Sequence, residues 1–321
     1  MRQKEKSTHR PNRRLFMHGA AASVALSGLS PILIQNAFAS QKMPLITKPI
    51  PSTGELIPVI GMGTWITFNV GQNIEARNER TEVLKTFFDL GGTMVDSSPM
   101  YGAAEDVMGY ALNRLTAQGI TPRDSLFSAS KVWTRGDGDS QIADSFRLWN
   151  LNEFDLFQIH NLLNWQEHLA ALRQLKAEGK IRYIGITTSH GRRHKDLEDI
   201  MKTEALDFVQ LTYNLQYRDV EQRLLPLAKD KGIAVIANRP LDGGRLFDRF
   251  GDKPLPPWAA EIGCANWAQF FLKFVASHPA MTCAIPATSQ ISHMQENVGA
   301  ARGRLPDEKT RAKMLSYLQN L

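Results

Sequence analysis

Four titratable side chains lie at or just past the ends of predicted β-strands: Asp96, Tyr101, Lys131 and His160. Side chains of these types can donate, accept or stabilise a proton, so a cluster of them could perform acid–base chemistry. The strands that carry them alternate along the chain with predicted helices. Because strand ends meet on one face in such a fold, the sequence predicts that the four side chains share one pocket.

Eight short segments of strand composition predict the sheet, and helical patterns fall between them. A hairpin over residues 48–58, with its turn at 52–55, is expected to close the bottom, and extra helices are expected at 289–300 and 306–318. The strands are predicted near 60–63, 94–96, 126–131, 156–160, 183–187, 208–211, 234–237 and 284–286, and the helices near 80–90, 104–115, 141–149, 166–178, 193–202, 220–231 and 264–277.

This alternation favours an α/β fold of the (β/α)8 TIM-barrel type over an open, doubly wound sheet. Gly61-Met62-Gly63 could suggest the dinucleotide-binding fingerprint of the open fold. The third glycine is missing, and no helix with an acidic residue about 20 positions later follows it. Gly61 and Gly63 are therefore interpreted as positions of close packing.

These features together resemble the aldo-keto reductases, which are (β/α)8 barrels that reduce carbonyl groups with a nicotinamide coenzyme and an Asp, Tyr, Lys and His tetrad. The similarity begins at residues 57–65 and extends to 285–297, so it covers nearly all of the chain after residue 39. No single motif carries it alone.

The resemblance implies a role for each tetrad residue. Tyr101, with a depressed pKa, would protonate the carbonyl oxygen, and Lys131 would stabilise the phenolate. Asp96 would hold Lys131, while His160 would orient the oxygen and could relay a proton. Taken singly, each residue fits a structural role in a turn, at a solvated strand end or in the core. Their joint occurrence in the order of the family favours catalysis.

The substrate mouth is expected to include Trp65 and Trp133 beside Tyr101 and His160, with Phe68 and Trp165 as further candidates. Aromatic residues at a barrel rim are equally often packing residues. Asn161-Leu162 follows His160, where many members place an aromatic residue and a proline, and this difference concerns substrate shape.

The resemblance also implies a coenzyme site. Asn238 stands where the family usually has a ring-stacking aromatic residue. Ala287 and His293 stand where many NADPH-specific members have Lys and Arg, so discrimination should be weak, with NADPH favoured and NADH possible. The expected contacts are Gly63, Thr64, Thr187, Thr188, Gln210, Asn238, Arg239, Pro240, Leu241, Gly243, Gly244, Arg245, Pro286, Thr288, Ser289, His293, Glu296 and Asn297.

Residues 1–39 have the three parts of a twin-arginine signal peptide: Arg13-Arg14, an apolar run over 19–34, and Ala37-Phe38-Ala39 before Ser40. Glycine, serine and proline interrupt the run, which makes an uncleaved membrane anchor the poorer interpretation. The expected product is one barrel domain, residues 40–321, exported to the periplasm by the twin-arginine translocation machinery. The runner-up is an inefficient leader and a cytoplasmic enzyme.

Nicotinamide coenzymes are scarce outside the cytoplasm, so this location conflicts with the chemistry. An alternative function is therefore an exported coenzyme-binding regulatory or sensor subunit with little turnover. Co-purified coenzyme without turnover would distinguish it from a reductase.

The charge of the chain gives no indication of a nucleic-acid partner. The leader holds six of the 38 Lys and Arg residues and one of the 32 Asp and Glu residues, so the remainder carries a net charge near +1. The eight His residues show no metal-ligand spacing, and no metal is expected. Cys264 and Cys283 could pair, but one bridge is no disulfide framework. We expect a monomer that acts on a small carbonyl or alcohol substrate.

Overall fold

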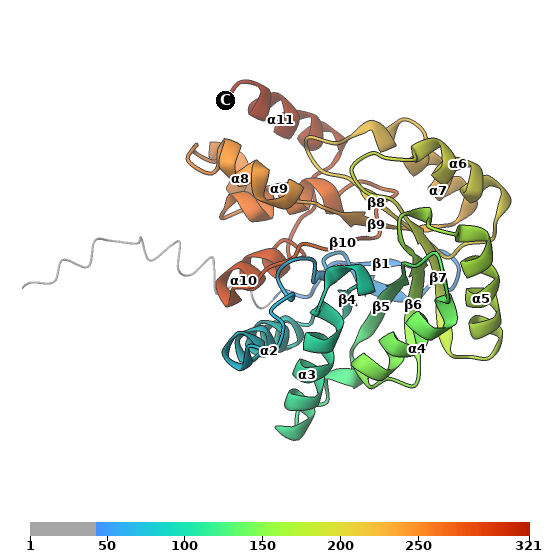
Figure 1. Ribbon diagram of the computed structural model, residues 1–321. Coiled ribbons are helices and arrows are strands. Elements are labelled where there is room, and N and C mark those ends of the chain that lie inside the picture. Colours follow the sequence, from blue (N-terminus) through green and yellow to red (C-terminus); the bar gives the residue numbers. More distant parts are fainter. Residues whose placement is uncertain (1–42) are drawn as a thin grey trace, which may run out of the picture. The chain divides into compact units, whose positions relative to one another are not determined.

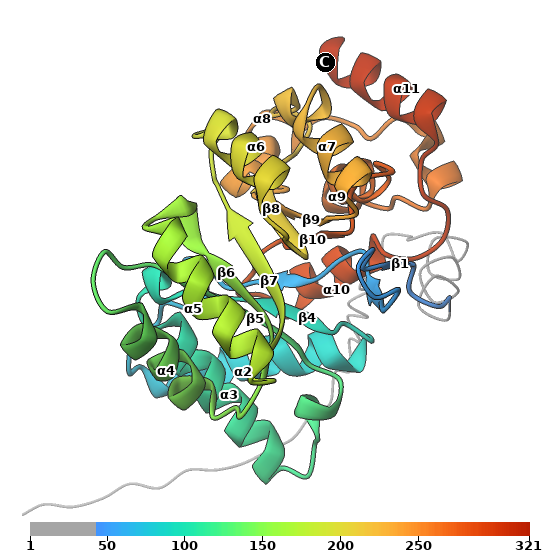
Figure 2. The same cartoon turned by 90° about the vertical axis from the view of Figure 1, so that its right-hand side faces the viewer.

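The computed structural model describes residues 43–321, and residues 1–39, the expected leader, lie outside this range. An antiparallel hairpin, β1 (Thr47–Pro49) and β2 (Leu56–Pro58), precedes the barrel. Parallel strands form one eight-stranded sheet in sequential order, as Figures 1 and 2 show. They are β3 (Met62–Gly63), β4 (Met94–Asp96), β5 (Phe127–Val132), β6 (Phe154–Ile159), β7 (Ile181–Thr187), β8 (Phe208–Thr212), β9 (Ala234–Asn238) and β10 (Cys283–Ala284).

The sheet closes on itself, because the first and last strands are joined by two parallel bridges. Ile60 pairs with Ala284, and Gly63 pairs with Ala287. Glycine is required at this seam, since a Cβ on Gly63 would lie 2.8 Å from the carbonyl oxygen of Ile285. The predicted barrel and its closing hairpin are confirmed.

Helices surround the barrel (Figure 1). The first of them begins six residues earlier than the sequence indicated, because Asn73 caps it by accepting a hydrogen bond from the Ala76 amide at 3.0 Å. The bounds are α2 (Ile74–Asp89), α3 (Ala104–Ala117), α4 (Gly138–Trp149), α5 (Trp165–Ala177), α6 (His194–Thr203), α7 (Leu224–Lys231), α8 (Arg245–Phe250), α9 (Trp267–Ala276), α10 (Ile291–Gly299) and α11 (Glu308–Gln319).

The barrel interior is apolar at its lower end and polar at its upper end. The lower layers contain Phe127, Tyr183 and Phe208, whose rings contact one another, and the hairpin residues Ile50 and Ile57 belong to the same cluster. Side chains of a strand alternate between its two faces. Residues two and four positions further along these strands therefore also face inward, at the carboxyl end of the barrel.

The two cysteines are both buried and unpaired, so the possible Cys264–Cys283 bridge is not present. Within residues 43–321, no helix combines the length and the apolar character that a membrane span requires. The same part of the chain contains no group of His, Cys, Asp and Glu side chains that could hold a metal ion.

Candidate active site

A cavity of about 960 Å³ opens at the carboxyl ends of the strands. Three of the four titratable residues, Asp96, Tyr101 and His160, line it. Lys131 is completely buried next to them. The structure therefore brings the four predicted residues together at the carboxyl end of the barrel.

The four side chains come from three neighbouring strands and the loops that follow them. Asp96 ends β4, Lys131 lies near the end of β5, and His160 directly follows β6. Tyr101 ends a short 3₁₀ helix, Pro99–Tyr101, in the loop after β4. Adjacent parallel strands pair Asp96 with Ala129, which places Lys131 one inward-facing position above that pair.

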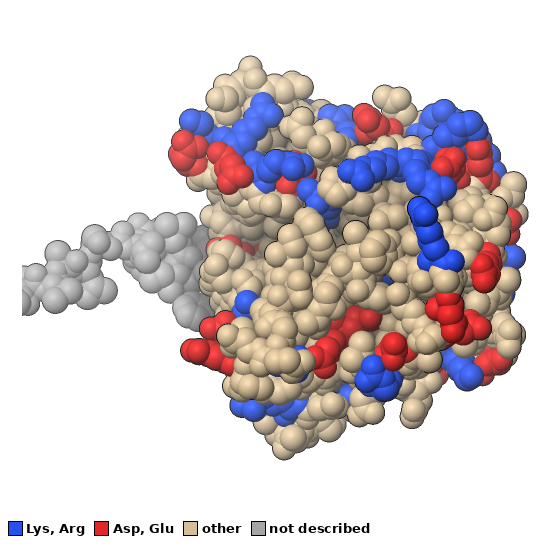
Figure 3. Space-filling model, viewed as in Figure 1, with Lys and Arg blue, Asp and Glu red and all other residues tan. Residues whose placement is uncertain are grey.

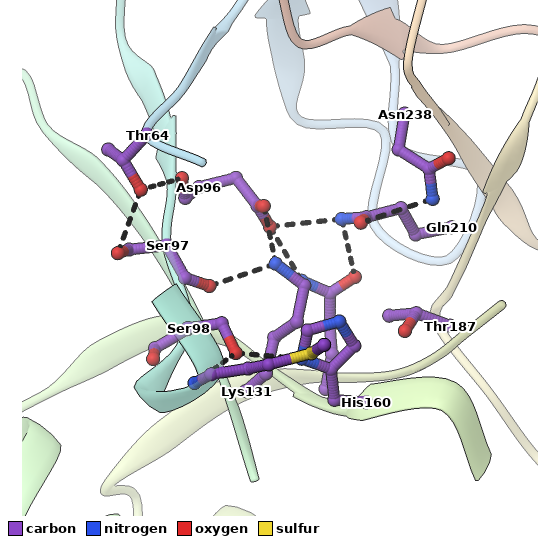
Figure 4. Close-up of polar contacts among 12 residues, drawn as sticks. Thr64, Asp96, Ser97, Ser98, Lys131, His160, Thr187, Gln210 and Asn238 are labelled. Atoms are coloured by element: carbon purple, nitrogen blue, oxygen red, sulfur yellow. Dashed lines mark hydrogen bonds and ion pairs between the residues drawn. The ribbon is translucent and has the colours of Figure 1, made fainter. Parts of the chain in front are cut away.

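Lys131 forms the centre of this group (Figure 4). Its ammonium group is ion-paired with Asp96 and donates a hydrogen bond to the Ser97 carbonyl oxygen at 2.8 Å. The same Nζ atom lies 5.1 Å from the centroid of the Tyr101 ring. The rings of Tyr101 and His160 meet edge to face, with centroids 5.6 Å apart.

The second carboxylate oxygen of Asp96 is held by two buried amides. Oδ2 accepts hydrogen bonds from Gln158 Nε2 at 3.0 Å and from Gln210 Nε2 at 2.9 Å. Gln158 was missed in the sequence, although it lies two residues before His160 on one strand and alternation directs both inward. Gln210 lines the cavity, but its amide nitrogen faces Asp96.

Burial and the ion pair decide the charges of the cluster. Burial alone would lower the pKa of Lys131, but Asp96 and Tyr101 outweigh it and hold that pKa above its usual range. Burial raises the pKa of Tyr101, against the opposing charge of Lys131. The sequence argument assumed a depressed pKa for this phenol, so the direction was wrong, because it neglected desolvation. At neutral pH the cluster thus holds a charged lysine and a protonated tyrosine.

His160 is neutral in this environment. Burial, and then the charge of Lys131, lower its pKa to about 2. A neutral imidazole can donate a hydrogen bond from one nitrogen and accept one at the other.

The structure confirms only part of the predicted lining of the substrate mouth. Trp65 lines the cavity, but Trp133 does not. The main chain of Trp133 is instead paired with the Gln141 side chain, through hydrogen bonds to its amide and carbonyl groups. Phe68 is completely buried, and Trp165 packs against the core. The mouth also includes Asn161, whose type was expected to affect substrate shape, and Met100, which was not predicted there.

The predicted coenzyme contacts line the same cavity, with two exceptions, Ser289 and Arg245. Arg245 is exposed and forms a salt bridge with Asp242 at 2.6 Å. Three arginines line the cavity: Arg192, Arg193 and the predicted Arg239. Arg239 has a left-handed backbone with φ of 50°, and its guanidinium packs over the Trp65 ring at 5.2 Å.

Two buried polar atoms of the cavity residues have no hydrogen-bond partner in the described part of the protein: Thr188 Oγ1 and Arg239 Nε. Thr188 directly follows β7, and Arg239 directly follows β9. A buried polar group without a partner costs free energy, so both atoms indicate a polar ligand in the cavity. The ligand-facing residues absent from the prediction also include Phe247 and Ile285.

A barrel whose strand ends carry this tetrad at the base of one cavity defines an oxidoreductase of the TIM-barrel class. Residues 59–312 match the model of the aldo/keto reductase family, and the chain belongs to that family. It is thus an enzyme that reduces aldehyde or ketone carbonyls with a nicotinamide coenzyme.

Two curated relatives come from Escherichia coli. The methylglyoxal reductase YeaE is 30% identical over 260 residues, covering 78% of this chain and 88% of that protein. An NADH-specific methylglyoxal reductase is 27% identical over 235 residues, covering 62% of this chain and 68% of that protein. Among solved structures, an aldo-keto reductase from Klebsiella pneumoniae in complex with NADPH is 27% identical, with a TM-score of 0.70 over 86% of this chain and 96% of that chain.

Replacing Lys131 by Met is expected to lower the free energy of unfolding by about 3–5 kcal/mol, because the buried Asp96 carboxylate loses its cation. Lys176→Met is the matched control, since Lys176 pairs with Asp207 at the surface with 41% of its side chain exposed. That change should cost less than about 1 kcal/mol. Urea denaturation of both variants measures the difference, and equal losses would contradict the assigned importance of the buried pair.

Proposed function

We propose that the chain reduces small aldehydes or ketones to alcohols, with Tyr101 as the proton donor and Asp96, Lys131 and His160 as its catalytic partners. The observation that supports this most is the position of Lys131, which is paired with Asp96 and lies under the Tyr101 ring at the base of the cavity. The names of the relatives support a reductase, and nothing in the comparisons supports the alternative of a regulatory subunit.

A bound nicotinamide coenzyme supplies the hydride that adds to the carbonyl carbon. Tyr101 gives its hydroxyl proton to the carbonyl oxygen as negative charge develops there. The ammonium group of Lys131 stabilises the phenolate that remains, and Asp96 keeps that ammonium in place. His160, neutral at physiological pH, orients the oxygen through a hydrogen bond.

The residues of the cavity fit such a coenzyme. Thr188 is a partner for the nicotinamide carboxamide, and Arg239 has an unpaired N–H for the diphosphate. Thr288 and His293 line the adenosine end. We favour NADPH, because Thr288 and its neighbours can hydrogen-bond a 2′-phosphate. NADH is also possible, because Ala287 and His293 offer that phosphate little charge. The related structures support this, since two contain NADP or NADPH, and one relative is NADH-specific.

For the substrate we propose a small 2-oxoaldehyde of the methylglyoxal type, on the support of the two E. coli relatives named for that compound. We propose a monomer with no nucleic-acid partner. On the face shown in Figure 3, side chains of both charges lie around a broad uncharged centre, which fits the absence of a nucleic-acid partner.

Tyr101→Phe should lower kcat/KM by about 10² to 10⁴-fold and leave coenzyme affinity unchanged, because the phenol acts only on the carbonyl oxygen. Tyr110→Phe is the control, since the Tyr110 hydroxyl is bonded to Asn78 outside the cavity. In the parent enzyme, reduction needs protonated Tyr101, whose pKa is raised. The rate should therefore stay level up to about pH 10 and fall only above it. An undiminished chemical step in Tyr101→Phe would remove this residue from the mechanism.

Arg239→Gln should weaken the binding of NADPH and NADH alike by about tenfold, because the loss of one charge-assisted hydrogen bond acts on the diphosphate common to both. Arg245→Gln should change neither affinity by more than about twofold, since Arg245 is exposed and paired with Asp242. Titration by quenching of tryptophan fluorescence gives the dissociation constants of each variant for NADPH and NADH, to be compared with those of the parent enzyme. A loss confined to NADPH would instead assign Arg239 to the 2′-phosphate.

We also propose that residues 1–39 are a twin-arginine signal that is removed before Ser40, leaving residues 40–321 as a single barrel domain in the periplasm. The support is the residue pattern itself, and the cytoplasm is the alternative location. Replacing both Arg13 and Arg14 by Lys should retain the protein in the cytoplasm with its leader attached. Cell fractionation shows the location, and the mass of the intact protein shows whether the leader is present. If the variant were found in the periplasm with the same mass as the processed parent protein, the twin-arginine route would be rejected.

A further inference from the structure

The His160 ring has one polar partner within residues 43–321, the hydroxyl of Ser98, as Figure 4 shows. Ser98 Oγ lies 2.7 Å from His160 Nδ1. Ser98 is completely buried, and only 5% of His160 is exposed. Water therefore has little access to this contact, and the two side chains must satisfy each other.

The hydrogen bonds around Ser98 decide which atom carries the proton. Its Oγ already accepts a hydrogen bond from the Met100 amide at 3.2 Å. The hydroxyl proton then has Nδ1 as its acceptor. If Nδ1 were protonated instead, Ser98 Oγ would accept two hydrogen bonds, one from Met100 and one from His160. The hydroxyl proton of Ser98 would then have no acceptor within residues 43–321, which costs free energy in a buried site. The contacts thus favour Nδ1 as acceptor.

The surrounding charges keep the ring neutral, so that a tautomer has to be selected. Lys131 on β5 and Tyr101 on the 3₁₀ helix are the titratable groups that face the ring. On the chain after His160, the Arg193 guanidinium is bonded to the carbonyl oxygens of Asn161 and Leu162. Burial and Lys131 lower the pKa of His160 far below neutrality.

We propose that Ser98 is a positioning residue that holds His160 as the tautomer with its proton on Nε2, so that this nitrogen donates a hydrogen bond to the substrate carbonyl oxygen. The proposal rests on the proposed carbonyl reduction. A neutral Nε2–H group can orient the oxygen towards Tyr101, and as an acid it is much weaker than the Tyr101 phenol. His160 is then an orienting donor, without the proton relay that the sequence left open.

Ser98 is suited to this task by its place in the chain. Its extended backbone, with φ of −165° and ψ of 146°, precedes Pro99, and the same Oγ caps the short helix that ends at Tyr101. One buried hydroxyl thereby fixes the relative position of the orienting group and the proton donor. A Ser98 variant could therefore lose activity either because the His160 tautomer changes or because Tyr101 is displaced. The experiment must distinguish these two effects.

A double-mutant cycle separates the two explanations. We expect Ser98→Ala to lower kcat about tenfold with KM changed less than threefold, and Ser98→Thr to restore most of kcat. In a His160→Ala background, Ser98→Ala should change kcat less than twofold. Ser145→Ala, which removes another buried serine hydroxyl from a site bonded to Glu105, is the control for folding and should leave kcat unchanged. A tenfold loss that persists in the His160→Ala background would overturn the proposal.

The tautomer can be measured without turnover. In ¹⁵N-histidine-labelled protein, with His160→Gln used to assign the resonances, the chemical shifts should show a protonated Nε2 and an unprotonated Nδ1. A protonated Nδ1 in the parent protein would overturn the proposal even if catalysis occurs. A protein without reductase activity but with the expected tautomer would contradict the proposed function alone.

Discussion

The buried ion pair between Lys131 and Asp96 is the interaction on which the site depends. Removing two charges from water costs several kcal/mol for each ion, so the pair is stable only if every remaining hydrogen-bonding position is filled. Here the Ser97 carbonyl takes a second proton of Lys131, while Gln158 and Gln210 occupy the other carboxylate oxygen. The charges are thus held by groups from β4, β5, β6 and β8, which only a closed barrel brings together.

The same pair sets the protonation of its neighbours. A permanent positive charge at Lys131 opposes the effect of burial on Tyr101 and adds to it at His160. One residue is therefore kept able to release a proton to a developing alkoxide, and the other is kept from becoming a second acid. The different roles of Tyr101 and His160 follow from the single ammonium group of Lys131 close to both rings, and they need no conformational change.

The sequence predicted the parts of the site that depend on strand periodicity. The residues at strand ends, Asp96, Lys131 and His160, point into the carboxyl end of the barrel because alternate residues of a barrel strand must point inward. Gln158 obeys the same rule and could have been found with it. The differences concern loops: Trp133 and Arg245 do not line the cavity, whereas Arg239, which was also predicted, lines it from a left-handed backbone. Loop side chains are directed by tertiary packing and strained dihedral angles, for which a single sequence carries no signal.

The crevice beyond the tetrad is constructed differently from the tetrad itself. Both carboxylate oxygens of Asp96 have partners, whereas within residues 43–321 Thr188 Oγ1 and Arg239 Nε are buried without one. The guanidinium of Arg239 packs over the Trp65 ring. The free protein carries the cost of these two unpaired atoms, and a ligand that supplies the missing acceptors recovers it. The tetrad is therefore complete before the coenzyme binds, and the unpaired groups of the crevice favour its binding.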